Sequence, residues 1–336
     1  MPNSLNWKVL ADYANSKSPF VLITVGNVKG SSPRETGAKI LVNHEHVIGT
    51  IGGGNLEFFA IARAKDMLTH ANDNEISEHK TPLTPNYDQC CGGLVQLIFE
   101  KINPQTSTWL PALFENISKD QTAWLVTDTI QKKRFIKTQL KIENSLTLNK
   151  ASWTNKQNQL IEPLQSDEIS VVIFGAGHVG KAIVNQLQYL NTNITVVDSR
   201  PEHIPNSSPK NVEFIETNNW KSLLKTISKE SYFLVVTHSH KLDYEITEEI
   251  LKQGEYRYLG LIGSKTKKVR FQRKLLANGI TQSQLNTLTC PIGLPSIQGK
   301  TPEVIAASVV AQILEIDTQT IQSHLMLPPT KRIQHV

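Results

Sequence analysis

Four apolar residues run directly into three spaced glycines near the middle of the chain. Residues 171–174 read Val-Val-Ile-Phe, and Gly175, Gly177 and Gly180 follow with the spacing G-x-G-x-x-G. A strand that ends in this spacing and opens a helix is typical of dinucleotide binding. The first glycine permits a tight turn, the second lets a pyrophosphate approach the backbone, and the third lets the helix pack close to the strand. The helix that begins at His178 would add N–H donors and the positive end of its dipole.

Apolar, β-branched segments alternate with segments of helical periodicity from residue 169 to residue 316. The predicted strands lie at 170–174, 194–197, 212–215, 232–236 and 258–262, and the predicted helices at 178–190, 244–252, 265–277 and 302–316. Strands that alternate with helices form a parallel sheet covered on both faces. The pattern therefore predicts an α/β domain with a Rossmann-like parallel sheet.

An acidic residue follows the glycines at the distance that this fold uses for ribose binding. Asp198 ends the second predicted strand, where a carboxylate would bind the adenine ribose hydroxyls. Arg200 lies close by and would suit a 2′-phosphate instead, so the sequence leaves NAD and NADP open. The alternative is a Rossmann fold whose site is empty or has another use.

The first half of the chain lacks this alternation. Helices are predicted at 5–15 and 55–68, the second with Asn55 as its N-cap, among strands at 20–28, 39–42, 46–51 and 94–99. An N-terminal α+β domain is therefore predicted over residues 1–150. A polar linker at 151–168, the Rossmann-like domain at 169–316 and a polar tail at 317–336 would follow.

Three consecutive glycines, Gly52, Gly53 and Gly54, stand at the start of the second predicted helix. A glycine-rich helix start exposes backbone N–H groups and can hold an anion, although a tight turn alone would use the same residues. Glu57 in the first helical turn is either a functional acid or a charge that the helix dipole favours.

Two further segments of this half carry reactive or charged side chains. Arg34, in the loop Gly-Ser-Ser-Pro-Arg at 30–34, could bind a phosphate or carboxylate as a fork, the alternative being an ordinary exposed arginine. Cys90 and Cys91 are neighbours followed by two glycines. Such thiols could hold a soft metal, carry a transferable sulfur or form a strained vicinal disulfide, or they could be two small buried residues.

Polar residues also end two strands of the predicted parallel sheet, on the edge where such folds bind ligands. His240 and Asp243 follow the strand 232–236 and could form a proton-handling pair, bind a metal, or be purely structural. Ser264 follows the strand 258–262 and opens a helix rich in lysine and arginine. That helix would attract a phosphate-bearing ligand or an acidic protein, or simply present a solvated face.

Composition excludes several classes of protein. Three cysteines, two of them adjacent, do not make a secreted disulfide framework and indicate a reducing, cytoplasmic setting. No signal peptide is seen, and the apolar stretches are far shorter than the ~20 residues of a membrane helix. The net charge of +5 permits an anionic ligand but does not indicate a nucleic-acid partner.

Taken together, these segments resemble the XdhC/CoxI family of xanthine dehydrogenase accessory proteins. The resemblance covers most of residues 20–315, in order along the chain. Its motifs are the segments 30–34, 52–57, 90–93 and 175–180, then His240 and Asp243, and then the segments 261–264, 290–293 and 300–303.

The resemblance implies a molybdenum cofactor chaperone. Such a protein would bind the cofactor (molybdopterin), protect it while an oxo ligand is exchanged for a sulfido ligand, and deliver it to a xanthine dehydrogenase-type molybdenum hydroxylase. A cysteine desulfurase would be the sulfur donor, and a homodimer is left open. By the same resemblance, Cys90 or Cys91 lies near the molybdenum, and Arg34 and the three glycines at 52–54 line the anion site.

Two other hypotheses remain beside a chaperone that turns over no substrate. One is an NAD(P)-dependent oxidoreductase that uses the glycines at 175–180 for its cofactor and His240 as proton donor. The other is a structural partner protein with a vestigial Rossmann site. In the chaperone hypothesis, the Rossmann-like half would hold a nucleotide or part of the pterin cofactor, and the resemblance does not choose between these ligands.

Overall fold

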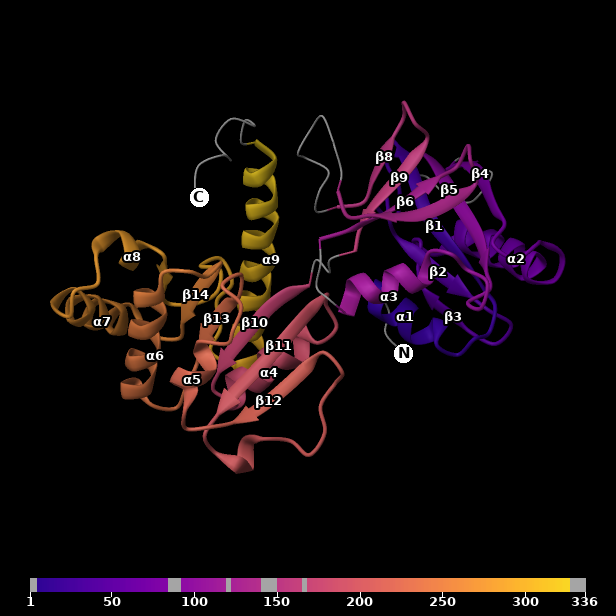
Figure 1. Cartoon of the computed structure of the whole chain (residues 1–336). Helices are drawn as coiled ribbons and strands as arrows, with labels where there is room; N and C mark the ends of the chain where they lie inside the picture. The colour runs from indigo at the N-terminus through magenta and orange to yellow at the C-terminus, as the bar shows by residue number, and fades with distance from the viewer. Residues whose placement is uncertain (1–4, 84–91, 119–121, 140–149, 165–167, 327–336) are drawn as a thin grey trace. The chain divides into compact units, whose positions relative to one another are not determined.

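The computed structural model describes residues 5–83, 92–118, 122–139, 150–164 and 168–326 of the chain. The chain divides into two compact units, Met1–Asp167 and Glu168–Val336 (Figure 1).

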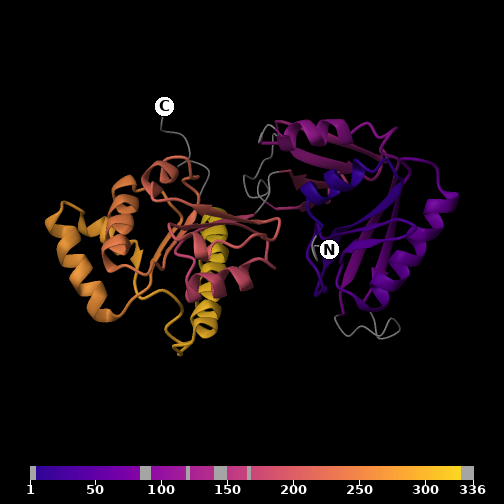
Figure 2. The same ribbon diagram turned by 90° about the horizontal axis from the view of Figure 1, so that it is seen from below.

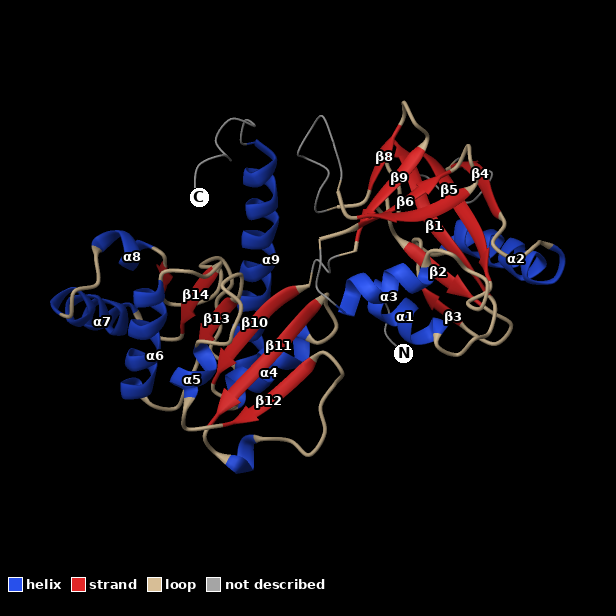
Figure 3. Cartoon of the chain, in the orientation of Figure 1, coloured by secondary structure: helices blue, strands red, loops and turns tan. Residues whose placement is uncertain are grey.

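Among the residues that the structure describes, the N-terminal unit contains two antiparallel sheets and three helices (Figure 3). The first sheet has the order β3-β2-β1-β5-β4, with β1 Phe20–Lys29, β2 Lys39–Val42, β3 Val47–Gly49, β4 Ile76–Pro82 and β5 Leu94–Ile102. The second has the order β7-β6-β9-β8, with β6 Trp124–Asp128, β7 Lys133–Lys137, β8 Ser152–Thr154 and β9 Gln159–Pro163. The helices are α1 Trp7–Ala14, α2 Gly54–His70 and α3 Leu110–Ser118.

Strand β1 is apolar along most of its length because both of its faces are covered. Val21 and Ile23 pack in a core with residues of α2, whereas Phe20 and Leu22 pack in a second core with residues of α1 and α3. Successive side chains of a strand point to opposite faces, so a central strand between two cores cannot alternate apolar and polar residues. The N-terminal α+β prediction is confirmed by these two layers.

The C-terminal unit is a six-stranded, fully parallel sheet with helices on both faces, as predicted. The order is β12-β11-β10-β13-β14-β15, with β10 Ile169–Phe174, β11 Thr192–Asp198, β12 Val212–Glu216, β13 Tyr232–Val235, β14 Tyr258–Leu261 and β15 Leu288–Thr289. Helices α4 His178–Leu187 and α9 Pro302–Met326 pack on one face, and α5 Trp220–Leu224, α6 His240–Gln253, α7 Lys265–Ala277 and α8 Gln282–Asn286 on the other. Figures 1 and 2 both show α9 beside α4. The strand order reverses between β10 and β13, and ligands of such sheets bind at the carboxyl edge there.

Three boundary predictions are wrong. The expected linker 151–168 contains β8 and β9, which pair with each other, and β9 also pairs with β6 inside the N-terminal unit. The expected tail is partly helical, because α9 continues to Met326. The N-cap of α2 is Gly53 and not Asn55, because the backbone of Gly54 is already part of the helix.

None of the helices in the described part of the chain combines the length and the apolar character that crossing a bilayer requires.

Candidate functional site

The glycine loop after β10 has the geometry that the sequence predicts. Gly175 has a φ of +117°, and a Cβ there would lie 2.5 Å from the carbonyl oxygen of Val236. A Cβ on Gly180 would lie 1.9 Å from the carbonyl oxygen of Gly175, so helix α4 packs directly on the turn. Gly177, the N-cap of α4, has open space where a side chain would be. The first and third glycines are thus needed for packing, whereas the second leaves room for a ligand at the helix N-terminus.

Asp198 lies at the carboxyl end of β11, and both of its oxygens are engaged within the protein. Oδ2 accepts the backbone N–H of Ala176 at 2.7 Å, and Arg200 donates from Nε to Oδ1 at 2.9 Å and from Nη2 to Oδ2 at 2.8 Å. Burial alone would raise the pKa of Asp198, but the hydrogen bonds from Arg200 and Ala176 outweigh it and hold this pKa well below its usual range. A carboxylate bonded in this way braces the glycine loop and has little capacity left for ribose hydroxyls.

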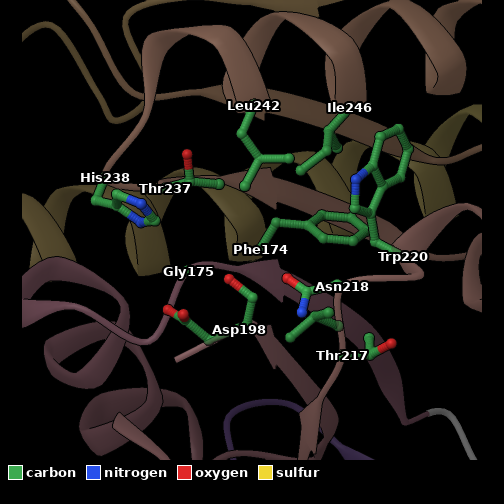
Figure 4. Close-up of a pocket in the computed structure, with 12 residues that line it drawn as sticks. Phe174, Gly175, Asp198, Thr217, Asn218, Trp220, Thr237, His238, Leu242 and Ile246 are labelled. Atoms are coloured by element: carbon green, nitrogen blue, oxygen red, sulfur yellow. The ribbon is translucent and has the colours of Figure 1, made fainter. Parts of the chain in front are cut away.

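A cavity of about 80 Å³ lies beside Asp198 at the carboxyl edge of the sheet (Figure 4). The rings of Phe174 and Trp220 stand at one end of it, and His238 stands at the other. Leu242 and Ile246 of α6 complete the apolar side. An aromatic, largely apolar cavity at this point of a doubly wound sheet suits a flat heterocyclic ring.

A second cavity, of about 250 Å³, lies between the carboxyl ends of β13 and β14. It brings together three of the predicted site residues, His240, Asp243 and Ser264, with Lys267. The partners of Asp243 are Thr237 and Lys267, and not His240 as predicted. Its Oδ1 accepts the hydroxyl of Thr237 at 2.7 Å, and its Oδ2 lies 2.5 Å from Nζ of Lys267.

Lys267 itself is a functional candidate that the sequence interpretation missed. Its segment was predicted to be a phosphate-attracting or solvated basic helix, but the side chain of Lys267 is only 10% exposed. A basic run at a helix start does not reveal which lysine is buried, because that depends on Asp243 from another part of the chain.

Three N-terminal motifs meet at one edge of the antiparallel sheet. Ser31 forms an isolated bridge with Gly92, and a Cβ on Gly93 would lie 2.0 Å from the carbonyl oxygen of Ser31. A Cβ on Gly52 would lie 2.2 Å from Cβ of Pro33. The loop 30–34 is therefore in close backbone contact with both glycine-rich segments, a proximity that their separation in sequence does not reveal. Cys90 and Cys91, directly before Gly92, lie outside the described residues.

The expected anion cradle at Gly52, Gly53 and Gly54 already holds an anion of the protein. Oε2 of Glu57 accepts the backbone N–H groups of Ile51 and Gly53, each at 3.0 Å, and the hydroxyl of Thr50 at 2.6 Å. The nest of backbone N–H groups exists as predicted, but its occupant is Glu57. Glu57 is therefore a residue that shapes the loop.

Arg34 is a cation of the loop 30–34. Its guanidinium binds both carboxylate oxygens of Glu35, from Nε at 3.2 Å and from Nη2 at 3.0 Å, and its side chain is 34% exposed. The hydrogen bond from Arg34 lowers the pKa of Glu35. Because an exposed pair of this kind contributes little stability, an incoming phosphate could replace Glu35 on the fork.

The remaining predicted residues are placed as follows. His178 is exposed in the first turn of α4, next to the open side of Gly177. No group of three or more metal-binding side chains occurs among the residues that the structure describes. The predicted metal ligands Cys90 and Cys91 are not among those residues, and Cys290 is a buried free thiol.

Two family models match the chain, one in each unit. Residues 14–75 match the model described as the XdhC and CoxI family, and residues 171–313 match the model described as the XdhC Rossmann domain. Together these segments make up more than half of the chain.

One curated relative and one solved structure show how far the likeness extends. The Escherichia coli K12 protein YqeB, described as uncharacterized, is 28% identical over 161 residues, which are 47% of this chain and 29% of YqeB. The chain thus spans less than a third of that relative. A Bacillus halodurans protein, whose crystal structure is described as that of a xanthine dehydrogenase, has a TM-score of 0.74 and 22% identity. The match covers 94% of this chain and 96% of that protein, so the two share a fold over nearly their whole length.

Proposed function

The chain belongs to the XdhC and CoxI family, and from this we propose that it serves the maturation of a xanthine dehydrogenase-type molybdenum hydroxylase. It binds the molybdenum cofactor, protects it while an oxo ligand is exchanged for a sulfido ligand, and delivers it to the hydroxylase. A cysteine desulfurase is the sulfur donor. The protein acts as a chaperone and has no catalytic residues of its own in this role.

The meeting of the three N-terminal motifs is the observation that supports this proposal. The bridge between Ser31 and Gly92 holds the loop of Arg34 against the segment that directly follows Cys91. A phosphate-binding fork and a pair of thiols would suit the phosphate and the dithiolene-bound soft metal of the cofactor, which are close to each other in molybdopterin.

The donor groups of these motifs fit parts of such a ligand. Arg34 would bind a phosphate by exchanging it for Glu35, and Cys90 or Cys91 would supply the thiolate for the molybdenum. Glu57 keeps the loop at 52–54 in shape and closes its N–H groups to the ligand. The open N-terminus of α4 at Gly177 would bind a nucleotide or pterin phosphate in the C-terminal unit.

The test is anaerobic purification of the full chain from a molybdenum-replete host, followed by metal analysis and fluorescence of the released, oxidised pterin. We expect near-stoichiometric molybdenum and pterin with the native chain, and loss of both with C90S/C91S. The matched control is Cys290→Ala, which removes the third thiol of the chain and leaves the adjacent pair intact. Equal occupancy in C90S/C91S and C290A would reject the thiol role.

Delivery is tested separately, by adding the loaded chain and a cysteine desulfurase to cofactor-free hydroxylase. We expect hydroxylase activity to appear with the loaded native chain and not with C90S/C91S, which is expected to carry no cofactor. Equal activation by free cofactor would reject the delivery role.

An NAD(P)-dependent oxidoreductase is the second candidate, because the turn at Gly175 and Gly180 has the packing of a dinucleotide loop. The engagement of Asp198 by Arg200 and Ala176 speaks against it, since the ribose would have to displace those bonds. Calorimetric titration with NADH and NADPH tests this hypothesis. Tight binding would favour the oxidoreductase, and no detectable binding would reject it.

A further inference from the structure

We propose that the cavity between β13 and β14 binds a phosphate group of the ligand that the C-terminal unit holds. This inference deepens the proposed function and rests on its assignment of a ligand to that unit. No residue of the glycine loop lines this cavity, so a phosphate bound in it would be held by other groups than those of the loop.

Lys267 provides the first argument. Its side chain is nine-tenths buried, and its Nζ donates to Asp243 Oδ2 at 2.5 Å and to the carbonyl oxygen of Ile262 at 2.9 Å. An ammonium group has three N–H donors, and the third has no hydrogen-bond acceptor among the described residues. The ring of Phe271, 5.2 Å away, is its further neighbour. A buried donor at the wall of a cavity calls for an acceptor inside the cavity.

Gly263 makes this position of Lys267 possible. A Cβ on Gly263 would lie 2.6 Å from Cδ of Lys267, so a side chain there would push the lysine away from the cavity wall. The glycine of this segment therefore serves the placement of a cation.

Two helices begin at the cavity. The N-caps Ser239 of α6 and Ser264 of α7 satisfy the N–H groups of Leu242 and Lys267. In the described part of the chain, no acceptor binds the first two N–H groups of either helix, which belong to His240, Lys241, Lys265 and Thr266. Helices of 14 and 13 residues each present the positive end of their dipole there.

The electrostatic potential in the cavity is expected to be positive. Asp243 is its one lining carboxylate among the described residues, and both oxygens of Asp243 are already bound. The Lys267–Asp243 pair is neutral as a unit, which leaves the two helix N-termini to set the local potential. A phosphate is the biological anion that such a combination of N–H donors accommodates.

The shape of the ligand follows from the neighbouring cavity. Thr237 and His238 line both cavities, so the aromatic cavity of Phe174 and Trp220 adjoins the cationic one (Figure 4). The two together suit a flat heterocycle that carries a phosphate. The positively charged ring of an oxidised nicotinamide would be repelled by the two positive helix ends.

Inorganic phosphate is the probe, titrated into the full chain by calorimetry. In S264D an aspartate keeps the N-cap hydrogen bond, because Asp caps a helix as well as Ser, but it adds a negative charge at the mouth of the cavity. We expect phosphate affinity to fall by about tenfold or more in S264D and to change by less than about threefold in the neutral cap variant S264N. Lys267→Met is unsuitable because it would leave Asp243 buried without its cation.

The charge-matched control is Thr281→Asp. Thr281 caps α8 and lines neither cavity, so T281D has the net charge of S264D and should bind phosphate like the native chain. Equal affinity in S264D and T281D, or no phosphate binding by the native chain, would overturn the proposal. These results are independent of molybdenum and pterin occupancy, so this site can fail while the maturation role holds, and the reverse.

Discussion

The carboxylate of Glu57 binds the backbone N–H of Gly53 at 3.0 Å and so closes the loop from which its own helix begins. The same oxygen also binds the N–H of Ile51 and the hydroxyl of Thr50. An anionic acceptor of three hydrogen bonds at a helix N-terminus contributes both the bonds and a favourable interaction with the dipole.

Glu57→Ala is therefore expected to lower the free energy of unfolding of the N-terminal unit by about 2–3 kcal/mol, since it leaves two backbone N–H groups without their partner. Urea unfolding followed by tryptophan fluorescence measures this, because Trp7, Trp109, Trp124 and Trp153 all lie in that unit. Asp66→Asn on the exposed side of the same helix is the control and should change stability by less than about 0.5 kcal/mol. Equal effects of the two substitutions would contradict the role of Glu57.

Gly177 and Gly180, in the loop after β10 and the first turn of α4, should differ in how much stability an added methyl group costs. Gly180→Ala places a Cβ 1.9 Å from the carbonyl oxygen of Gly175 and should cost about 1–3 kcal/mol or more, because α4 must move off the turn. Gly177→Ala meets open space at a negative φ of −73° and should leave stability nearly unchanged. Thermal unfolding by circular dichroism checks both variants. A destabilised G177A would mean that the space is not free for a ligand.

The bracing of the glycine loop by Asp198 should depend on pH. The pKa of Asp198 is lower in the folded than in the unfolded chain, so its contribution is present above about pH 4 and is lost as the pH falls through the folded pKa. At pH 7, Asp198→Asn should cost about 2 kcal/mol, since the charged bonds to Arg200 and Ala176 become weaker. Urea unfolding at stepwise lower pH measures this. The difference in free energy of unfolding between the native chain and D198N should become smaller below pH 4. A gap that stays constant down to pH 2 would show that the charge of Asp198 is not involved.

A buried ion pair connects the two sheets of the N-terminal unit. Nη1 of Arg134 in β7 lies 3.1 Å from Oε2 of Glu100 in β5, and both side chains are at most 2% exposed. Removing the cation in Arg134→Met should cost about 3–5 kcal/mol, because the carboxylate stays buried alone. Replacing both residues, as in E100L/R134M, should restore part of that loss.

The loss of stability that R134M causes should vary with pH. Burial raises the pKa of Glu100 above that of the unfolded chain, so the protonated folded form is favoured at low pH and stability is lost as the pH rises through the folded pKa. The deficit of R134M should therefore be smaller at pH 5 than at pH 8. A double variant as unstable as R134M would show that the two residues do not act as a pair.

Long apolar segments made most of the fold predictable. The strand before Gly175 and the helices between the parallel strands carry their periodicity in the sequence, and the glycine spacing marks the turn. Strand β8 has only three residues, Ser152–Thr154, and it is held by pairing with β9, so no local pattern separates it from a polar linker.

The sites were predictable as motifs but not as contacts. Glu57 and Asp198 were identified as acids in the right places, yet the donors that occupy their oxygens come from turns whose exact path the sequence does not specify. Lys267 appeared as one lysine of a basic run, and its burial depends on Asp243, which comes from another segment of the chain.

Strands β8 and β9 complete the N-terminal sheets before residue 168, and every strand of the parallel sheet lies after it. In the part of the chain that the structure describes, each sheet lies wholly on one side of this point, so a gene divided there would encode two polypeptides that each keep their own sheets. The two family models also fall one on each side of that division. The architecture therefore lets evolution fuse, separate or replace either half without breaking a β-ladder.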